Sequence, residues 1–337
     1  MSIRRVWIVG AGKRVKETAL PAFLSLPEAF EVAGVLARSS RFLDVGERRF
    51  SIRALADLRK AELRANDLVY VAVGKEAMPS VLARLALLDR ARLELLIDTP
   101  VLKIKYLRHA HLLEGWHRAS VAEDVVHLPW FETLRAAVAD VRALTFDRSA
   151  YAYHGIAQAR AVCRSRVVSA KRVKLGVGRA RREIDFESGA RAFVIEPRDY
   201  AHGRVIAEGL NARVTDRLDP GESGTLLVPW IEDGRCAGFR AGDVTTRLAP
   251  EEIALLGPDA PDASVVARME SMKRVAFRRL AAEVAAGRGA HPIADGLEDM
   301  AVDWFLERFG SWSAGGWRDL RRPAARRLWS GIGRLAR

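Results

Sequence analysis

Residues 6–12 read Val6-Trp7-Ile8-Val9-Gly10-Ala11-Gly12, an apolar run with β-branched residues that ends in two glycines. A helical pattern follows, with Leu20, Phe23 and Leu24 on one side. A strand that ends in a glycine turn and opens a helix is the context in which backbone N–H groups bind a nucleotide pyrophosphate. This stretch therefore predicts the first strand, turn and helix of a dinucleotide-binding domain.

The composition is that of an ordinary globular protein. The chain has 337 residues, of which 49% are hydrophobic and 29% are charged, which excludes disordered and fibrous classes. Its length suggests about two domains, each large enough for its own core. No apolar run approaches the roughly 18–20 residues that span a bilayer, and the first residues lead into a strand rather than a signal peptide.

Strands and helices alternate through the first part of the chain. A helix is expected around residues 81–85, and strands are expected at residues 6–9, 30–36, 68–73 and 93–97. This alternation predicts right-handed βαβ units and a parallel sheet, and the continuous apolar strands fit a sheet covered on both faces. We expect an α/β protein with an N-terminal Rossmann dinucleotide-binding domain over residues 1–122.

From about Ala143 the pattern changes to successive strands. They are expected at residues 142–147, 180–186, 191–196, 204–208 and 225–229, with turn signals between several of them. Residues 265–286 and 296–308 have the apolar spacing of amphipathic helices. We expect a C-terminal α+β domain over residues 123–310 with an open, mostly antiparallel sheet, and a basic tail over residues 311–337.

The glycine turn indicates how a dinucleotide would be held. Gly10 permits the tight turn, and Gly12 lets the backbone approach the pyrophosphate at a helix N-terminus. The third position of the motif is Val15, not Gly or Ala, which predicts looser packing of helix on strand there. The alternative is a Rossmann-like domain that has kept the loop only as a turn.

The segment after the second strand favours NADP over NAD. An NAD-binding domain usually carries Asp or Glu here for the ribose hydroxyls, but residues 36–41 contain no carboxylate. Arg38, with Ser39 beside it, offers paired donors that suit a 2′-phosphate. The alternative is that Arg38 is only a surface residue.

Several segments, in order, resemble the Gfo/Idh/MocA family, the group of glucose–fructose oxidoreductase and inositol dehydrogenase. The resemblance covers most of residues 3–310, and it is carried by residues 6–12, 20–23, 68–73, 95–102, 121–130, 153–155 and 295–308. It implies a Rossmann domain, a second α+β domain with an open sheet, a nicotinamide cofactor between them and a small-molecule substrate. It also implies homo-oligomers, dimers or tetramers, built through that sheet.

The departures from the family pattern concern its catalytic residues. Where the family's sugar dehydrogenases have a lysine within Glu-Lys-Pro, this chain has Thr99, and the aspartate four residues before the family's histidine is replaced by Ala150. Only His154 remains. Gly74 and Met78 stand where a proline and a histidine are common. Thr99 can donate a hydrogen bond but cannot stabilise a developing alkoxide by positive charge.

His154 is the best remaining proton donor or acceptor, because its intrinsic pKa is close to neutral. Tyr151 and Tyr153 flank it. On a strand both tyrosines would point away from the His154 side, whereas a helix that begins near His154 would let Tyr153 turn inward. Reduction of an imine needs less help than oxidation of an alcohol, so imine or activated C=X reduction stays open. Glu123, His127 and Tyr106 are second-line candidates.

The expected site residues follow from these arguments. The expected catalytic residues are His154, Tyr153 and Thr99. The residues expected to bind NADP(H), or alternatively NAD(H), are Gly10, Gly12, Lys13, Arg14, Val15, Arg38, Ser39, Arg41, Val73, Gly74, Asp98, Thr99 and Glu123. No metal is expected, because the spacing of His109, His111 and His117 does not place three ligands on one helix face.

Nearly half of the net charge of +13 lies at the C-terminus, where residues 318–337 hold seven Arg and one Asp. Leucine, isoleucine and tryptophan side chains are interleaved with these arginines, which suits a peripheral membrane contact, an acidic partner or packing back on the protein. No nucleic-acid motif accompanies the charge. Two cysteines, Cys163 and Cys236, form no disulfide framework, so a cytoplasmic protein is expected.

Three functions from different classes remain at this point. The first is an NADP-dependent oxidoreductase that acts on a small polar substrate such as a sugar, a cyclitol or a biosynthetic imine. The second is a non-redox member of the family that binds nucleotide as a sensor or scaffold, which Thr99 and Ala150 favour. The third is a docked scaffold that acts through the basic tail.

Overall fold

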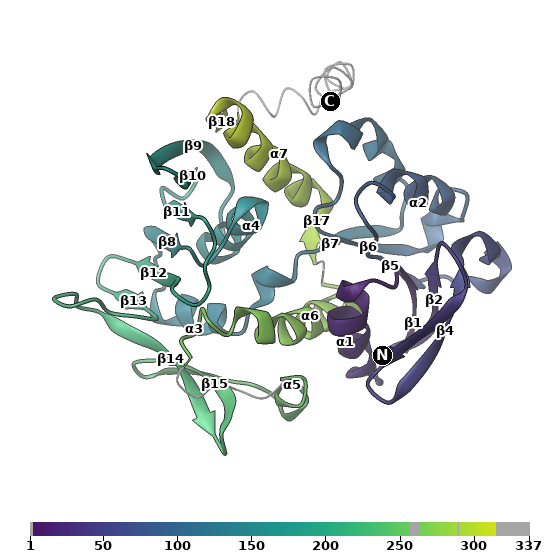
Figure 1. Ribbon diagram of the computed structural model, residues 1–337, viewed down its shortest axis with the longest axis horizontal. Helices are drawn as coiled ribbons and strands as arrows, with labels where there is room; N and C mark the ends of the chain where they lie inside the picture. Colours follow the sequence, from purple (N-terminus) through teal and green to yellow (C-terminus); the bar gives the residue numbers. More distant parts are fainter. Residues whose placement is uncertain (1–2, 257–262, 289, 315–337) are drawn as a thin grey trace. The chain divides into compact units, whose positions relative to one another are not determined.

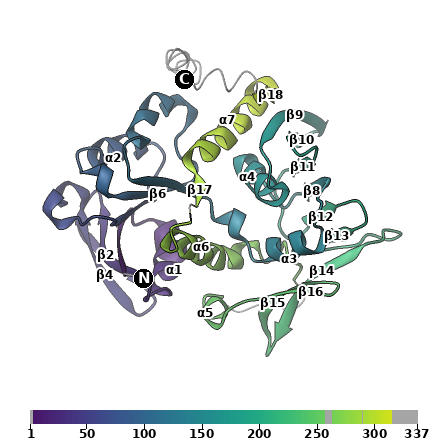
Figure 2. The same cartoon turned by 180° about the vertical axis from the view of Figure 1, so that it is seen from behind.

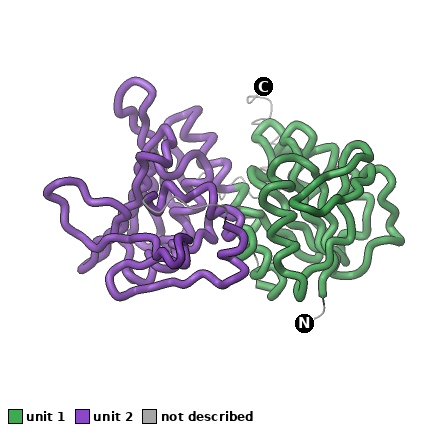
Figure 3. The backbone as a smooth tube through the Cα atoms, turned by 60° about the horizontal axis from the view of Figure 1, so that its bottom comes forward, with its two compact units in different colours: residues 1–123, 277–297, 320–337 green, residues 124–276, 298–319 purple. Residues whose placement is uncertain are grey.

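The computed structural model describes residues 3–256, 263–288 and 290–314. The chain forms two compact units, coloured separately in Figure 3. Unit 1 contains Met1–Glu123 and Phe277–Leu297, and unit 2 contains Asp124–Ala276 and Glu298–Asp319. The sequence predicted an uninterrupted second domain over residues 123–310. The structure differs because Phe277–Leu297 returns to unit 1, where apolar side chains of this segment complete a core.

The described part of unit 1 is built on a sheet with the order β17-β7-β6-β5-β1-β2-β4-β3. Strands β4, β2, β1, β5, β6 and β7 are parallel, and the edge strands β3 and β17 are antiparallel to their neighbours. The bounds are β1 (Arg4–Val9), β2 (Phe30–Ala37), β3 (Arg41–Val45), β4 (Arg48–Ala54), β5 (Leu68–Val71), β6 (Glu94–Asp98), β7 (Arg118–Ala122) and β17 (His291–Pro292). The chain order reverses beside β1, so the glycine turn stands where open α/β sheets bind ligands.

Apolar cores cover both faces of this sheet. Along β1, Val6 and Ile8 pack into one core, and Trp7 and Val9 pack into the other, as the alternation of a strand requires. Helices α1 (Leu20–Leu24) and α6 (Met269–Ala285) contribute to the first core, and α2 (Met78–Leu85) contributes to the second (Figures 1 and 2). This is the doubly covered α/β sheet that the sequence predicted.

The helix after the glycine turn is widened in its middle. It starts at Lys13 and passes through a π-helical stretch, η1 (Val15–Ala19), before it becomes α1. Pro21 has no N–H to donate to the carbonyl four residues earlier, and the Leu20 N–H bonds to the Val15 carbonyl, five residues back. The side chain of Val15 is fully buried in the core.

Unit 2 is built on a second sheet with the order β16-β15-β14-β13-β12-β8-β11-β10-β9-β18 among the described residues. Its pairings are antiparallel except β8 with β11 and β13 with β14. The bounds are β8 (Ala143–Asp147), β9 (Val167–Gly176), β10 (Arg179–Phe186), β11 (Arg191–Glu196), β12 (Arg204–Glu208), β13 (Arg213–Thr215), β14 (Thr225–Glu232), β15 (Arg235–Ala241), β16 (Val244–Arg247) and β18 (Ser311–Ser313). The mostly antiparallel sheet predicted for the second domain is confirmed.

In unit 2, buried ion pairs hold one helix against another. Besides the first turns of α6, the α-helices with described residues in unit 2 are α3 (Trp130–Ala137), α4 (Ala152–Cys163), α5 (Pro250–Ile253) and α7 (Ile293–Phe309), of which α7 begins in unit 1. On α4, buried Arg160 donates to Asp299 at 2.6 Å and to Glu298 at 3.0 Å, both on α7. Since an unpaired buried charge is strongly unfavourable, this cluster fixes α7 against α4.

The basic tail predicted over residues 311–337 begins later than expected. Ser311–Ser313 form β18 and pair with β9, so they belong to the sheet and not to a separate tail. The reason is that the backbone of this segment completes the hydrogen bonding of the sheet edge. The arginine-rich stretch 318–337 lies outside the described residues. Among the described helices, none is long and apolar enough to cross a membrane.

Candidate active site

The glycine turn after β1 is held by the strands on either side. The Gly10 N–H donates to the Leu36 carbonyl of β2 at 2.7 Å, and the Ala72 N–H, just after β5, donates to the Val9 carbonyl at 2.8 Å. Gly10 has φ of +130°, and a Cβ there would lie 2.0 Å from the Ala72 oxygen. Only glycine fits this position.

No contact within the described protein requires a glycine at position 12. A Cβ at Gly12 would meet no atom within 4 Å, and its φ is not in the left-handed region. Its backbone therefore faces open space at the start of the helix that begins at Lys13, beside the reversal of strand order at β1. A phosphate group fits such a place, because helix N–H groups and a close backbone approach are both available.

The end of β2 differs in part from the expectation. Arg38 and Ser39 directly follow the strand, and both are exposed. Arg41, however, opens β3, the first strand of a hairpin with β4 that the sequence pattern did not reveal. Among the described residues, the side chains of Arg38 and Arg41 make no ion pair, so both guanidinium groups are available to an anion.

A charged cluster lies at the carboxyl ends of β5 and β6. Asp98, the last residue of β6, accepts from Arg14 Nε at 3.1 Å and from the Tyr70 hydroxyl at 3.4 Å. The Arg14 guanidinium also lies 5.2 Å from the centre of the Phe277 ring. Arg14 and Asp98 were expected near the cofactor, and the structure brings these two together.

Lys75 is a member of this cluster that sequence reasoning missed. Its amine donates to the Asp98 carbonyl at 2.9 Å. Burial lowers the pKa of the Lys75 ammonium, and the positive charge of Arg14 lowers it further, whereas Asp98 and Glu123 oppose the shift. The signal was present, because Lys75 follows Gly74 just beyond a buried strand, at the edge where ligands bind. Thr99, in contrast, brings no charge to this edge.

In unit 2, His154 lies in the first turn of α4, so the helical alternative for this segment is the correct one. The ring of Tyr153 is 4.1 Å from the His154 ring, and the ring of Tyr151 is 5.1 Å away, between centroids. Ala152, at the helix start, has φ of +49°, and its N–H donates to Glu196 Oε1 at 2.9 Å. A non-glycine residue in this conformation is strained, and such strain clusters at functional sites.

Asp303 of α7 is the second residue that the sequence did not reveal. Its Oδ1 lies 2.9 Å from Nη2 of Arg182. The Arg182 guanidinium is also paired with Glu196 and Glu307, and the residue as a whole is only 2% exposed. Burial raises the pKa of the Asp303 carboxyl to about 6. Arg182 and His154 act against this rise, and Glu196 and Glu307 add to it. The position four residues before His154 holds no acid, but an acid from a distant helix is close enough to sense the histidine's charge.

Asp303→Asn is expected to change how stability depends on pH. Because the folded carboxyl has a raised pKa, its contribution is fully favourable below about pH 4 and is lost as the pH rises through about 6. The asparagine variant should therefore gain about 2 kcal/mol relative to wild type between pH 4 and pH 7. Urea unfolding of both proteins at several pH values measures this gain, and a difference that does not vary with pH would contradict the assignment.

Comparisons with family models and with curated proteins find no match. Solved structures do match. The myo-inositol dehydrogenase of Corynebacterium glutamicum matches with a TM-score of 0.59 and 13% identity over 93% of this chain and 99% of that chain. An oxidoreductase of Agrobacterium radiobacter, solved with NAD+, L-tartaric acid and magnesium, matches with a TM-score of 0.59 and 12% identity over 94% of this chain and 99% of that chain. UDP-N-acetylglucosamine 3-dehydrogenase of Acidithiobacillus ferrooxidans matches with a TM-score of 0.54 and 15% identity over 90% of this chain and 96% of that chain.

These neighbours are Gfo/Idh/MocA-type oxidoreductases. The chain has the Gfo/Idh/MocA fold. The resemblance stated from the sequence is thereby confirmed, although identities of 10–16% carry the fold and not the activity. Within this Gfo/Idh/MocA fold, every residue expected to bind the cofactor belongs to unit 1, and His154 with Tyr153 belongs to unit 2.

One side chain that was expected to contact the cofactor lies in the core, where it cannot reach a ligand. Val15 was expected to contact the cofactor, but its side chain points into the core of unit 1. The expectation of loose packing there is also wrong, since Val15 is fully buried in that core. Of the remaining residues, Val73 and Thr99 are half-buried, Gly74 is exposed and Glu123 is buried.

Proposed function

We propose that this chain is an oxidoreductase that uses a nicotinamide cofactor, with NADP(H) favoured over NAD(H). The observation that supports this most directly is the open backbone at Gly12, in a glycine turn next to the reversal of strand order. Arg38, whose guanidinium has no ion-pair partner among the described residues, supports the preference for a 2′-phosphate.

The chemistry proposed is hydride transfer to or from a small polar substrate, namely a sugar, a cyclitol or a biosynthetic imine or related C=X group. A bound nicotinamide would supply or accept the hydride, and the protein has to bind, orient and move a proton. Lys75 offers positive charge at the carboxyl edge of the sheet, which Thr99 lacks. His154, whose ring lies 4.1 Å from that of Tyr153, is the proposed proton group of unit 2.

Arg38→Ala is expected to weaken NADPH binding by tenfold to a hundredfold, because a charge-assisted contact to phosphate contributes about 1.5–3 kcal/mol. Binding of NADH should change little, since that cofactor has no 2′-phosphate. Isothermal titration calorimetry with both cofactors measures the two effects. Arg48→Ala is the matched control, because Arg48 is an exposed arginine in the neighbouring hairpin. Equal losses for NADPH and NADH would exclude Arg38 as the reader of the 2′-phosphate.

A second candidate function is a non-redox nucleotide-binding protein that acts as a sensor or scaffold. Thr99 and Ala150, at positions where the resemblance implies catalytic residues, favour it. The two functions differ in one measurement. Mixing the NADPH complex with cyclic imines or keto sugars should lower the absorbance of the reduced nicotinamide if the protein is an oxidoreductase, and mixing the NADP+ complex with sugars or cyclitols should raise it. A sensor should leave the absorbance unchanged in both experiments.

The homo-oligomer through the sheet of unit 2 also stays a proposal. On β10, Arg181 pairs with Glu183 and stacks over Phe193 of β11 at 5.4 Å, and Lys171 of β9 pairs with the same glutamate at 3.0 Å. A subunit contact here would therefore be rich in ion pairs. Light scattering of the purified protein at low and high salt tests for it.

A further inference from the structure

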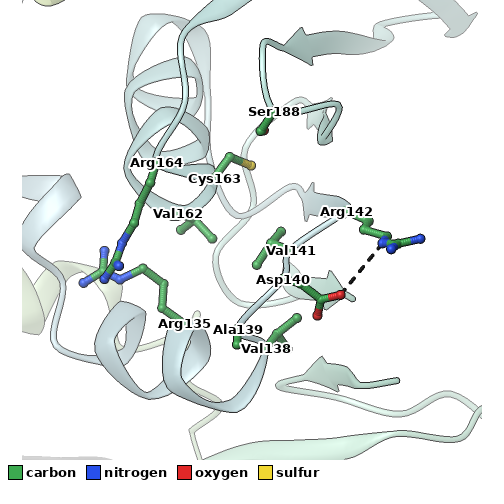
Figure 4. Close-up of a pocket in the computed structure, with 10 residues that line it drawn as sticks. All are labelled: Arg135, Val138, Ala139, Asp140, Val141, Arg142, Val162, Cys163, Arg164 and Ser188. Atoms are coloured by element: carbon green, nitrogen blue, oxygen red, sulfur yellow. Dashed lines mark ion pairs between the residues drawn. The ribbon is translucent and has the colours of Figure 1, made fainter. Parts of the chain in front are cut away.

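Unit 2 contains a cavity of about 430 Å³ that none of the preceding arguments uses (Figure 4). It lies where the end of α3, the segment before β8 and the end of α4 meet. The residues that line it are Arg135, Val138, Ala139, Asp140, Val141, Arg142, Val162, Cys163, Arg164 and Ser188. Its volume is within the range of pockets that bind small molecules.

The charge of this cavity is unbalanced. Asp140 is its only acidic lining residue, and it is already engaged: Oδ2 accepts from the Leu210 N–H at 3.0 Å and lies 3.8 Å from Arg142 Nε. Figure 4 shows this ion pair as a dashed line on one side of the cavity. The guanidinium groups of Arg135 and Arg164 lie beside each other on the other side (Figure 4), with no carboxylate of the lining between them.

Arg135 has hydrogen-bonding capacity to spare. One of its terminal nitrogens reaches the Ala161 carbonyl at 3.4 Å, a weak bond to the last turns of α4. Its Nε is buried and has no hydrogen-bond partner. Burial lowers the pKa of the Arg135 guanidinium, and Arg164 lowers it further, whereas Glu132 opposes the shift. An anion between the two arginines would accept from Nε and remove their mutual repulsion.

Arg164 has a backbone conformation that favours glycine over other residues. It ends α4 with φ of +48° and ψ of +38°, the left-handed conformation that glycine usually supplies at a helix end. An arginine there is strained, and its side chain is exposed and has no ion-pair partner among the described residues. The strain has an explanation if the guanidinium binds a ligand.

The cavity is suited to binding and not to covalent chemistry. Cys163 also lines it, but burial raises the pKa of this thiol to about 12, so the thiol stays neutral and unreactive. We propose that this cavity binds a small molecule that carries a phosphate group, held between Arg135 and Arg164. Two planar guanidinium groups offer paired N–H donors that match phosphate oxygens. The cavity uses no residue assigned to the cofactor.

The test is calorimetric titration of the full chain with inorganic phosphate at fixed ionic strength. Wild type should bind phosphate, and Arg135→Gln and Arg164→Gln should bind at least tenfold more weakly. Arg164→Gly is the decisive variant, because glycine suits the left-handed backbone and should preserve folding while it removes the side chain. Arg166→Gln, at an exposed arginine that does not line the cavity, should bind as wild type does.

Several outcomes would overturn the proposal. They are no heat of phosphate binding to wild type, equal binding by wild type and Arg164→Gly, or tighter binding of succinate than of phosphate. The last would show that the arginines select carboxylates. Arg38→Ala separates this proposal from that for the cofactor, since it should reduce NADPH affinity and leave phosphate binding at the cavity unchanged.

Discussion

Gly12→Ala is expected to reduce NADPH affinity by at least a hundredfold while the protein folds normally. A methyl group at Gly12 meets no protein atom within 4 Å, so stability should change by less than about 0.5 kcal/mol. The same methyl group would occupy the space through which a pyrophosphate approaches the backbone. Calorimetric titration with NADPH, together with thermal unfolding of the free protein, separates the two effects.

Gly10→Ala is the matched control for that prediction, and it should fail in the opposite way. A Cβ at Gly10 would lie 2.0 Å from the Ala72 oxygen, and the φ of +130° is unsuited to alanine. We expect a loss of about 3 kcal/mol or more in the free energy of unfolding. If Gly12→Ala retains wild-type affinity, the turn serves only as a connection between strand and helix, and the cofactor proposal is wrong.

The architecture could be predicted because local patterns determine it. Residues 6–12 predicted a strand and a turn, and the spacing of Leu20, Phe23 and Leu24 predicted the helix after them. The continuous apolar strands that follow predicted a sheet covered on both faces. The hairpin of β3 and β4 was missed, because its strands are rich in charged residues and resemble a surface loop. The return of Phe277–Leu297 to unit 1 was missed because an amphipathic pattern shows that a helix has an apolar face but not which core receives it.

The candidate catalytic groups were harder to predict, for a different physical reason. Thr99 and Ala150 stand where the resemblance implies a lysine and an aspartate. Lys75 reaches the Asp98 carbonyl from the turn between β5 and α2, and Asp303 reaches the surroundings of His154 from a helix about 150 residues later in the chain. Charge can be supplied to a site from any nearby element, so spacing along the chain does not predict it.

Arg182→Met is expected to destabilise unit 2 by about 3–5 kcal/mol, the usual effect of leaving buried charge unpaired. Arg182 is buried and holds Glu196, Asp303 and Glu307 together, and Glu196 in turn accepts the N–H at the start of α4. Without the guanidinium, the mostly buried carboxylates of Glu196 and Asp303 lose their shared partner and are left beside the half-exposed carboxylate of Glu307. Chemical unfolding at pH 7, followed by tryptophan fluorescence, measures the loss.

Two further variants determine whether charge, and not packing, explains that loss. Arg181→Met, on the same strand, removes a more exposed arginine from the ion pair with Glu183 and should cost no more than about 1 kcal/mol. Adding Asp303→Asn to Arg182→Met removes one of the carboxylates that repel each other, and should restore part of the lost stability. If the double variant is no more stable than Arg182→Met alone, the Asp303 carboxyl does not sense this cluster. Its raised pKa, and with it the link between α7 and the His154 turn, would then need another cause.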